Sequence, residues 1–239
     1  MQPYLFPYVG SFSLAAATDV YVFFDNVQYI RRGWMHRNRI HKPGGGWQYF
    51  GVPVVKAPRH TPIHEIQLSE SVDWRRRLKE SLSLAYGSVA PRFDAVMGLV
   101  EDAIDPPVDG LSQLNMRSFA LCCSELGLDL NAHRAASLDL EEPAHPWGWA
   151  VAACTKLGAS RYVNPPGGAD LYPPEPFAQH DLAVGILRPQ LLEYDRAGLP
   201  WEPGLSVLDA LMFQPPEAVR HLVDAATIDW RTMGDSDAI

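Results

Sequence analysis

The chain has 239 residues, of which 47% are hydrophobic and 20% charged, so it can bury one sizeable core, or one core with a small attached subdomain. Its formal net charge of −8 at pH 7 argues against a general role on nucleic acids or on anionic membrane surfaces. It has no run of about 18 apolar residues and no secretory signal at its start, and three cysteines are a poor disulfide framework. We therefore expect a cytoplasmic protein that does not span a membrane.

Residues 2–10 (QPYLFPYVG) place prolines on both sides of aromatic residues, just before a helix predicted over residues 12–18. Such a turn would leave helix N-terminal amides directed outward, where a phosphate or carboxylate is stabilised. An aromatic-rich loop packed over the core is the more common arrangement. Because a parallel-sheet protein ordinarily needs a strand before such a cluster, we expect the natural chain to begin earlier. The cluster contributes five candidate substrate-binding residues: Gln2, Tyr4, Pro7, Tyr8 and Gly10.

Residues 25–38 follow an apolar run at 20–24 that predicts a buried strand. They combine a carboxylate, amides, a phenol, an indole, an imidazole and guanidinium groups, more polar variety than a turn requires. Arginines here could bind a phosphate or carboxylate, and an indole could stack on a planar or sugar ring. The candidate catalytic residues are Asp25 and His36, and the candidate binding residues are Gln28, Tyr29, Arg32, Trp34, Arg37 and Asn38. The alternative is a solvated basic loop with Trp34 folded into the core.

The middle of the chain predicts a β-meander followed by helices. Residues 47–55 and 63–68 are rich in strand-forming residues, and residues 44–46 (GGG) are typical of a hairpin or loop tip. Helical spacing follows over residues 74–86, 93–104 and 111–126, with a strand at 128–132. We expect a single α/β domain over residues 1–232 with an inserted β/helical subdomain around 41–108, and a frayed tail at 233–239.

In the second half, a helix over 149–157 and strands at 161–163 and 184–187 continue the alternation. This alternation predicts an α/β fold of the Rossmann-like three-layer type, with a mostly parallel sheet and a small β-hairpin/helical insertion. Residues 164–168 (NPPGG) directly follow a strand, where open α/β sheets place ligand loops, and their glycines allow positive φ. The candidate binding residues here are Asn164, Gly167, Gly168 and Tyr172. A rigid turn without a ligand is the alternative. We expect this turn and residues 2–10 to line one cleft.

Three other patterns suggest chemistry. Ser206 and Asp209 precede an apolar run, and the main interpretation of this spacing is a helix N-cap box. A ligand-binding pair is the second interpretation, so we keep both as candidate binding residues. His60 and His64 have the i, i+4 spacing of a metal-binding pair on a helix. The proline between them prevents the helix that would bring the imidazoles together. We predict no metal site, and the sequence identifies no cofactor.

Four ordered blocks resemble the WbqC-like protein family. They are residues 2–10; residues 25–29 (DNVQY) with 32–34 (RGW) and 37–40 (RNRI); residues 158–159 (GA) and 162–168 (YVNPPGG) with 171–172 (LY); and residues 203–213 (PGLSVLDALMF). The resemblance spans nearly the whole chain. The family's name comes from bacterial surface-polysaccharide gene clusters, so the resemblance implies bacterial polysaccharide or natural-product biosynthesis.

In that setting we expect a transferase that moves an acyl or aminoacyl group onto the amine of an activated sugar or related small, anionic metabolite, with Asp25 or His36 accepting the amine proton. Family members usually carry a polar Asp-Arg pair where this chain has residues 147–150 (WGWA), which implies a different or less polar substrate. One alternative is a nucleotidyltransferase-like enzyme, although residues 7–10 lack the histidine pair that those enzymes use. The other is a non-catalytic protein that binds a small molecule or a partner.

Overall fold

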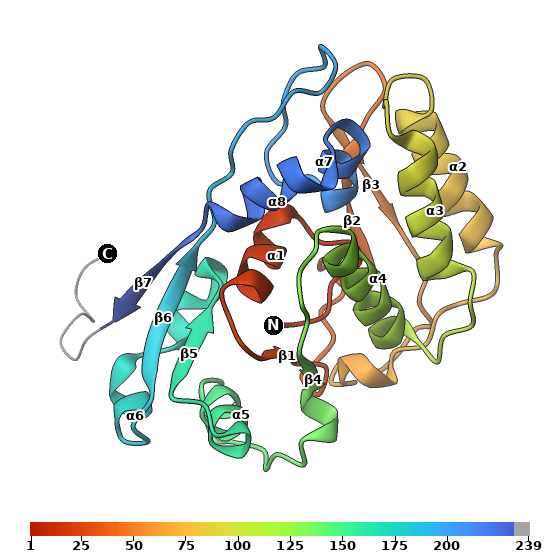
Figure 1. Cartoon of the computed structure of the whole chain (residues 1–239). Coiled ribbons are helices and arrows are strands. Elements are labelled where there is room, and N and C mark those ends of the chain that lie inside the picture. The colour runs from red at the N-terminus through yellow and green to blue at the C-terminus, as the bar shows by residue number, and fades with distance from the viewer. Residues whose placement is uncertain (232–239) are drawn as a thin grey trace.

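The computed structural model describes residues 1–231 as a mixed α/β structure of helices and small sheets (Figure 1). The frayed tail predicted at residues 233–239 lies outside the described residues. Within residues 1–231, no helix combines the length and apolar character that crossing a bilayer requires.

The described helices are α1 (Val9–Ala16), α2 (Trp74–Tyr86), α3 (Phe93–Ile104), α4 (Leu111–Glu125), α5 (Gly148–Leu157), α6 (Pro174–Ala178), α7 (Val207–Phe213) and α8 (Pro216–Asp224), with 3-10 turns η1 (Ile63–Glu65), η2 (Ala135–Ser137) and η3 (Pro166–Leu171). The described strands are β1 (Tyr21–Phe23), β2 (Arg37–His41), β3 (Trp47–Gly51), β4 (Ala132–Arg134), β5 (Arg161–Asn164), β6 (Ala183–Arg188) and β7 (Thr227–Arg231). The sequence predicts α1 to α5 and β1, β3, β5 and β6 within a few residues. It does not predict α6, α8, β2 or β7.

The described strands form three small sheets. β1 pairs in parallel with β4, while β5 pairs in parallel with β6, which in turn pairs antiparallel with β7. β2 and β3 form an antiparallel hairpin whose tip lies at residues 44–46, as predicted, and all three glycines there have positive φ. The mixed α/β class is confirmed, whereas the single, mostly parallel sheet of a Rossmann-like fold is not.

Local signals set the helix ends. α2 begins after Asp73, whose carboxylate accepts a hydrogen bond from the Arg76 amide at 3.0 Å. Glycines follow α4 and α5 with φ of +62° at Gly127 and +67° at Gly158, a conformation that glycine adopts with little strain. These stops are where the sequence predicts them.

Two predictions for the region before α2 are wrong in detail. Residues 37–41 form strand β2, although their polar composition suggested a recognition loop. Asn38 and Ile40 are buried while Arg37 and Arg39 are only partly so, which is the alternation of a strand with one buried face. Residues 63–68 form η1 and a single bridge between Val54 and Leu68, because the prolines nearby interrupt a longer ladder.

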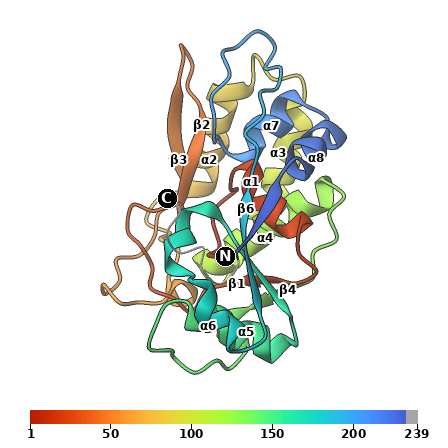
Figure 2. The ribbon, with the colours of Figure 1, turned by 90° about the vertical axis from the view of Figure 1, so that its left-hand side faces the viewer.

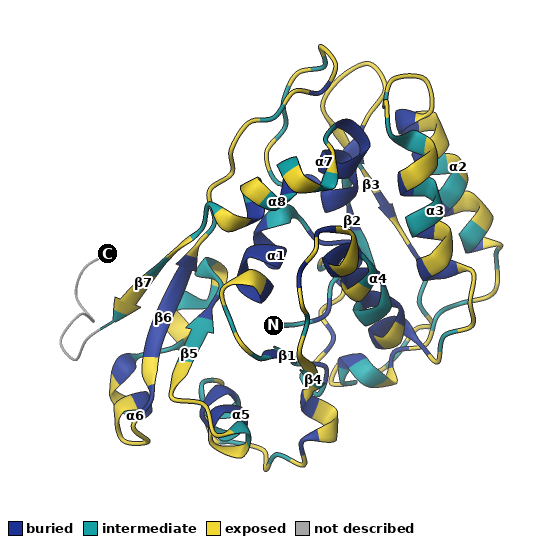
Figure 3. Ribbon diagram, viewed as in Figure 1, coloured by how far each residue is buried: buried dark blue, intermediate teal, exposed yellow. Residues whose placement is uncertain are grey.

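Buried apolar side chains form two clusters. The larger one joins residues as distant as Phe12, Trp74, Val100 and Leu208. The smaller one lies among α5, α6, β5 and β6 and is centred on Phe177. Figure 3 shows β6 and α7 largely buried and the outer faces of α2 and α3 exposed. Residues from 41–108 thus contribute to the larger core, and the boundaries of an inserted subdomain stay a prediction.

Candidate functional site

One face of the β2–β3 hairpin carries exposed aromatic rings and guanidinium groups. Arg39 lies opposite Tyr49 in the antiparallel register, and side chains opposite one another share a face. Arg37 is two residues away on the same strand, so it lies on this face too. Trp34 and Trp47 complete the group through contacts with the arginines and the tyrosine. We call these five residues the aromatic–arginine face.

The arginines of this face stack on its rings. The Arg37 guanidinium lies 4.1 Å from the centroid of the Tyr49 ring, and that of Arg39 lies 5.4 Å from Trp34 and 5.2 Å from Trp47. These contacts stabilise rings that remain 40% exposed at Trp34 and Trp47 and 44% exposed at Tyr49. Trp34 is therefore not folded into the core, and the face offers surfaces on which planar or sugar rings can stack.

Beside this face, a hollow of about 330 Å³ lies between the hairpin and the start of α2. Figure 2 shows the hairpin standing along α2. A Cβ at Gly51 would lie 2.4 Å from the carbonyl oxygen of His36, so glycine is needed for β3 to pass this close. The charged, aromatic or imidazole side chains in the wall of the hollow are His36, Arg37, Tyr49, Phe50, Trp74 and Arg77.

The imidazole of His36 is held in place by a neighbour from the same loop. Its Nδ1 lies 2.7 Å from the hydroxyl of Tyr29, which is itself buried. Desolvation, and next the charge of Arg37, lowers the pKa of His36 below its ordinary value of 6.5. His36 is thus neutral at pH 7, the protonation state that a general base requires.

Arg37 also anchors the loop ahead of it. Its guanidinium donates a hydrogen bond to the carbonyl oxygen of Arg32, whose side chain is exposed and whose φ is +63°. Gln28 is exposed, and its backbone bridges to Pro62. Of the predicted binding residues, Trp34 and Arg37 therefore lie on the aromatic–arginine face and Arg32 lies beside it, while Tyr29 is buried beneath His36 and Asn38 faces the core.

Asn38 faces the core and joins three of the four sequence blocks. Its amide donates to the carbonyl oxygens of Leu5 at 3.1 Å and Phe6 at 2.9 Å. The Phe6 carbonyl also accepts from the Ser206 hydroxyl at 2.7 Å. Phe6 has a φ of +38°, which is uncommon for a residue other than glycine. Asn38 and Ser206 are 4% and 1% exposed, so these hydrogen bonds hold the three blocks together inside the protein.

The other predicted residues of the first block are also packed in place. The Tyr4 hydroxyl donates to Gln2 Oε1 at 3.1 Å, and the Pro7 carbonyl accepts from the Val207 amide at 2.8 Å. A Cβ at Gly10 would lie 2.4 Å from the Tyr8 ring, so the ring covers the start of α1 closely. This packing resembles an aromatic-rich loop that covers the core, the more common arrangement. An anion bound at the start of α1 stays a prediction.

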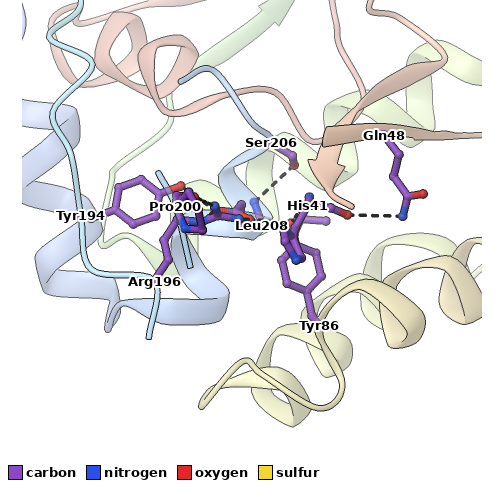
Figure 4. A network of polar contacts seen from close by, with 9 residues as sticks. His41, Gln48, Tyr86, Tyr194, Arg196, Pro200, Ser206 and Leu208 are labelled. Atoms are coloured by element: carbon purple, nitrogen blue, oxygen red, sulfur yellow. Dashed lines mark hydrogen bonds and ion pairs between the residues drawn. The ribbon is translucent and has the colours of Figure 1, made fainter. Parts of the chain in front are cut away.

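Asp209 is the centre of a buried polar network, and Figure 4 shows its partners Tyr86, Tyr194 and Arg196. It is 0% exposed and pairs with Arg196, which is 1% exposed, through distances of 2.8 Å to Oδ1 and 2.9 Å to Oδ2. Oδ1 also accepts from the Tyr86 hydroxyl, and Oδ2 from the Tyr194 hydroxyl, each at 2.8 Å. Four donors thus satisfy a carboxylate that has no contact with solvent. Asp209 therefore ties α7 to α2 and to residues 194–196.

Asp25 occupies a second buried polar site. Its Oδ2 accepts from Arg134 Nε at 2.8 Å and from the Ser112 hydroxyl at 3.3 Å, while Oδ1 accepts from the Ala136 amide at 3.0 Å. Its own carbonyl accepts from the amide of His64. The carboxylate is 0% exposed. This geometry favours a structural carboxylate that accepts a backbone amide, and a catalytic role for Asp25 stays a prediction.

Asp25→Asn separates the two roles. Asparagine can still accept from the Ala136 amide but loses the charge opposite Arg134, so we expect the free energy of unfolding to fall by about 1–3 kcal/mol. Turnover of a substrate should then change by no more than a few fold. Denaturant titration and steady-state kinetics measure both quantities. A fall in turnover of about 10²-fold with unchanged stability would instead identify Asp25 as the base.

The Asn164 loop follows the carboxyl end of β5, as predicted. The Tyr162 hydroxyl donates to Asn164 Oδ1 at 2.9 Å, and the Asn164 amide donates to the Pro165 carbonyl at 2.7 Å. Positive φ is found at neither Gly167 nor Gly168. Gly168 instead permits close packing, since a Cβ there would lie 2.9 Å from Asn164 Nδ2 and 3.4 Å from the Tyr172 ring.

The cleft predicted between this loop and residues 2–10 stays a prediction. Tyr8 lines a small cavity together with Tyr194 and Trp201. Residues 161–163, just before the loop, line a larger groove together with Met1.

Several site residues were not predicted from the sequence: Arg39, Trp47, Tyr49, Arg77 and Arg196. The glycine run at residues 44–46, between segments 37–41 and 47–51 of equal length, would have indicated that these two segments pair as a hairpin. Arg196 carries no such signal, because a buried arginine in a loop is recognised only by its partner.

Comparison with known proteins identified one matching family. The family model described as the WbqC-like protein family matches residues 2–221. The chain is also similar to "Uncharacterized protein Rv1507c" of Mycobacterium tuberculosis (strain ATCC 25618 / H37Rv), with 29% identity over 224 residues, which cover 93% of this chain and 95% of that protein. No solved structure matches the chain.

Proposed function

The chain belongs to the WbqC-like protein family, and we propose that it is a transferase of polysaccharide or natural-product tailoring. In this proposal it moves an acyl or aminoacyl group onto the amine of a nucleotide-linked sugar or a related small metabolite. The observation that carries the proposal is the hollow in which a neutral His36 lies beside Arg37 and Arg77, next to the exposed rings of the aromatic–arginine face.

The aromatic–arginine face fits an anionic, ring-bearing substrate. A diphosphate or carboxylate is bound by guanidinium groups with charge-assisted hydrogen bonds, and Arg37 and Arg77 lie in the same wall. A sugar or base ring can stack on Trp34 or Trp47, whose rings are already flanked by Arg39. These two kinds of group together match a sugar joined to a nucleotide.

His36 supplies the proton acceptor in this proposal. With a proton on Nδ1 donated to the Tyr29 oxygen, Nε2 carries the lone pair. The substrate amine forms a bond from its nitrogen to the acyl carbon, and the bond from that carbon to the donor's leaving group breaks. The leaving group takes the electron pair, and Nε2 takes the proton that the amine loses. The positive charge formed on His36 is short-lived, because Arg37 and burial disfavour it.

Binding of a UDP-linked amino sugar, followed by isothermal titration calorimetry, tests the site. We expect Arg37→Ala to raise Kd by about 10- to 100-fold, since a desolvated, charge-assisted contact is lost. Arg32→Ala should have a smaller effect in the same direction, because its side chain is exposed. The matched control is Arg220→Ala, which removes a surface arginine that pairs with Asp224 on α8.

Two outcomes would contradict the proposal. An unchanged Kd with a lowered Tm in Arg37→Ala would assign Arg37 a structural role. Tight binding without turnover, for every activated acyl or aminoacyl donor supplied, would favour the alternative of a protein that binds a small molecule without catalysis.

A further inference from the structure

Residues 26–64 carry seven arginines and lysines and no aspartate or glutamate. The rest of the chain has 13 arginines and lysines against all 28 aspartates and glutamates, a net charge of −15. None of the seven cations takes part in the ion pairs found among residues 1–231. On α2, by contrast, Arg75, Arg76 and Lys79 all pair with carboxylates. Residues 26–64 therefore form a positively charged region on an acidic protein.

Two loops of this region, residues 28–33 and 55–62, lie side by side, and we call them the basic loop pair. The amide of Tyr29 donates to the carbonyl of Thr61 at 2.9 Å, and the guanidinium of Arg31 donates to a backbone carbonyl of the second loop. Four cations of the loop pair are exposed: Arg31, Arg32, Lys56 and Arg59. The two loops together thus present a single cationic surface.

Each loop also presents one aliphatic side chain to solvent. Ile30 is 54% exposed and Val55 is 50% exposed, and each directly precedes a cation in the sequence. The backbone of Val55 is held in place, since its amide donates to the Gln67 carbonyl at 2.9 Å. Apolar side chains among charged ones are the composition of a transient interface between proteins, where an apolar centre is surrounded by a polar rim.

The basic loop pair borders the hollow that holds His36. The hydroxyl of Tyr29, from the first loop, lies 2.7 Å from His36 Nδ1. The guanidinium of Arg37, in the wall of the hollow, donates to the carbonyl of Arg32 in the same loop. A protein bound to the loop pair would therefore lie next to the hollow.

We propose that the basic loop pair docks a small acidic carrier protein, which holds an acyl or aminoacyl group as a thioester at the end of a flexible arm. Carboxylates of the carrier face the four cations, and an apolar side chain of the carrier contacts Ile30 and Val55. The arm then enters the hollow beside His36. The carrier is the donor in the transfer described above, so its role rests on the proposed function.

Charge and apolar contact together select this occupant. An acidic protein is attracted to residues 26–64 and repelled by the rest of the chain, which fixes where it docks. A nucleic acid is attracted to the same cations, but Ile30 and Val55 offer no ring on which a base could stack. A small free anion would leave both aliphatic side chains in water, whereas a protein partner buries them.

A thioester also completes the proton balance of the transfer. The amine nitrogen forms a bond to the acyl carbon, the carbon–sulfur bond breaks, and sulfur leaves with the electron pair as a thiolate. The proton lost by the amine passes to Nε2 of His36 and from there to the thiolate. The second step is downhill, because a thiol is a weaker acid than an imidazolium. His36 is thereby neutral again for the next transfer.

Isothermal titration calorimetry with a holo bacterial acyl carrier protein, at about 50 mM salt and without an acceptor amine, tests the docking. We expect Lys56→Glu to raise Kd by about tenfold or more, because an attractive contact becomes repulsive. Ile30→Ser should raise Kd by a similar factor. The matched control is Lys156→Glu on α5, which reverses another exposed lysine with the same change in net charge and should alter Kd by less than about twofold.

The proposal is overturned if the carrier protein does not bind, or if Lys56→Glu and Lys156→Glu weaken its binding equally. A transfer RNA that binds more tightly than the carrier, with the same loss in Lys56→Glu, would assign the loop pair to a nucleic acid instead.

Docking and transfer are measured separately, so the two proposals can fail independently. A carrier that binds with the expected pattern of Kd values but whose acyl group reaches no amine would support the docking surface and contradict the transferase. Turnover with a small acyl thioester, unchanged in Lys56→Glu and without any binding of the carrier, would support the transferase and overturn the carrier as its donor.

Discussion

Asp209→Ala is expected to lower the free energy of unfolding by about 3–5 kcal/mol, the scale for removing one partner of a buried ion pair. The variant leaves the Arg196 guanidinium, which is 1% exposed, without its carboxylate. It also removes the acceptor of the Tyr86 and Tyr194 hydroxyls, so three elements lose their common contact. Denaturant titration with a spectroscopic probe measures the loss.

Two variants make this expectation specific. Asp224→Ala on α8 removes a carboxylate that is 44% exposed and paired with Arg220, so it should cost less than about 1 kcal/mol. Asp209→Asn keeps the size and some acceptors and should fall between the two. A loss at Asp209→Ala no larger than at Asp224→Ala would show that water enters the network. If Asp209→Ala weakened ligand binding without a loss of stability, Asp209 would be a binding residue, as the sequence analysis first suggested.

His36→Gln is expected to lower turnover by about 10²-fold or more once a substrate is in hand, the usual scale for loss of a general base. Glutamine keeps a hydrogen-bonding group near Tyr29 but cannot accept a proton at neutral pH. Because burial and Arg37 lower the pKa of His36 below 6.5, the neutral form is present at pH 7. Turnover of the unmodified protein should therefore hold at neutral pH and fall only as pH drops below 6.5, through that lowered pKa.

A pH–rate profile measured on both proteins decides the role of His36. The acidic limb should be absent in His36→Gln, because the titrating group has been removed. His221→Gln, at an exposed position on α8, is the matched control and should keep both the rate and the profile. An acidic limb that persists unchanged in His36→Gln would mean that another group takes the proton, and Asp25→Asn would then be the next comparison.

Local chemistry alone predicted much of the secondary structure. α2, α3 and α5 have the predicted extents within a residue, because periodic apolar residues and caps act within a few residues of one another. The glycine stops after α4 and α5 follow from a conformation that glycine adopts with little strain. β2 was missed for the converse reason, since its exposed face holds arginines whose partners lie on another strand.

The candidate residues divide in the same way. The sequence by itself determined the family, the mixed α/β class and which segments carry unusual polar chemistry, because blocks, periodicity and residue type are all properties of the chain. Only the tertiary structure decided which of those residues reach a surface. Asn38 and Arg37 are neighbours in sequence, yet the pleat of β2 turns one into the core to join Phe6 and leaves the other on the aromatic–arginine face. Asp25 and Asp209 took buried positions through sets of donors that include Arg134 and Tyr86, each more than a hundred positions away, and no local pattern encodes a contact that distant.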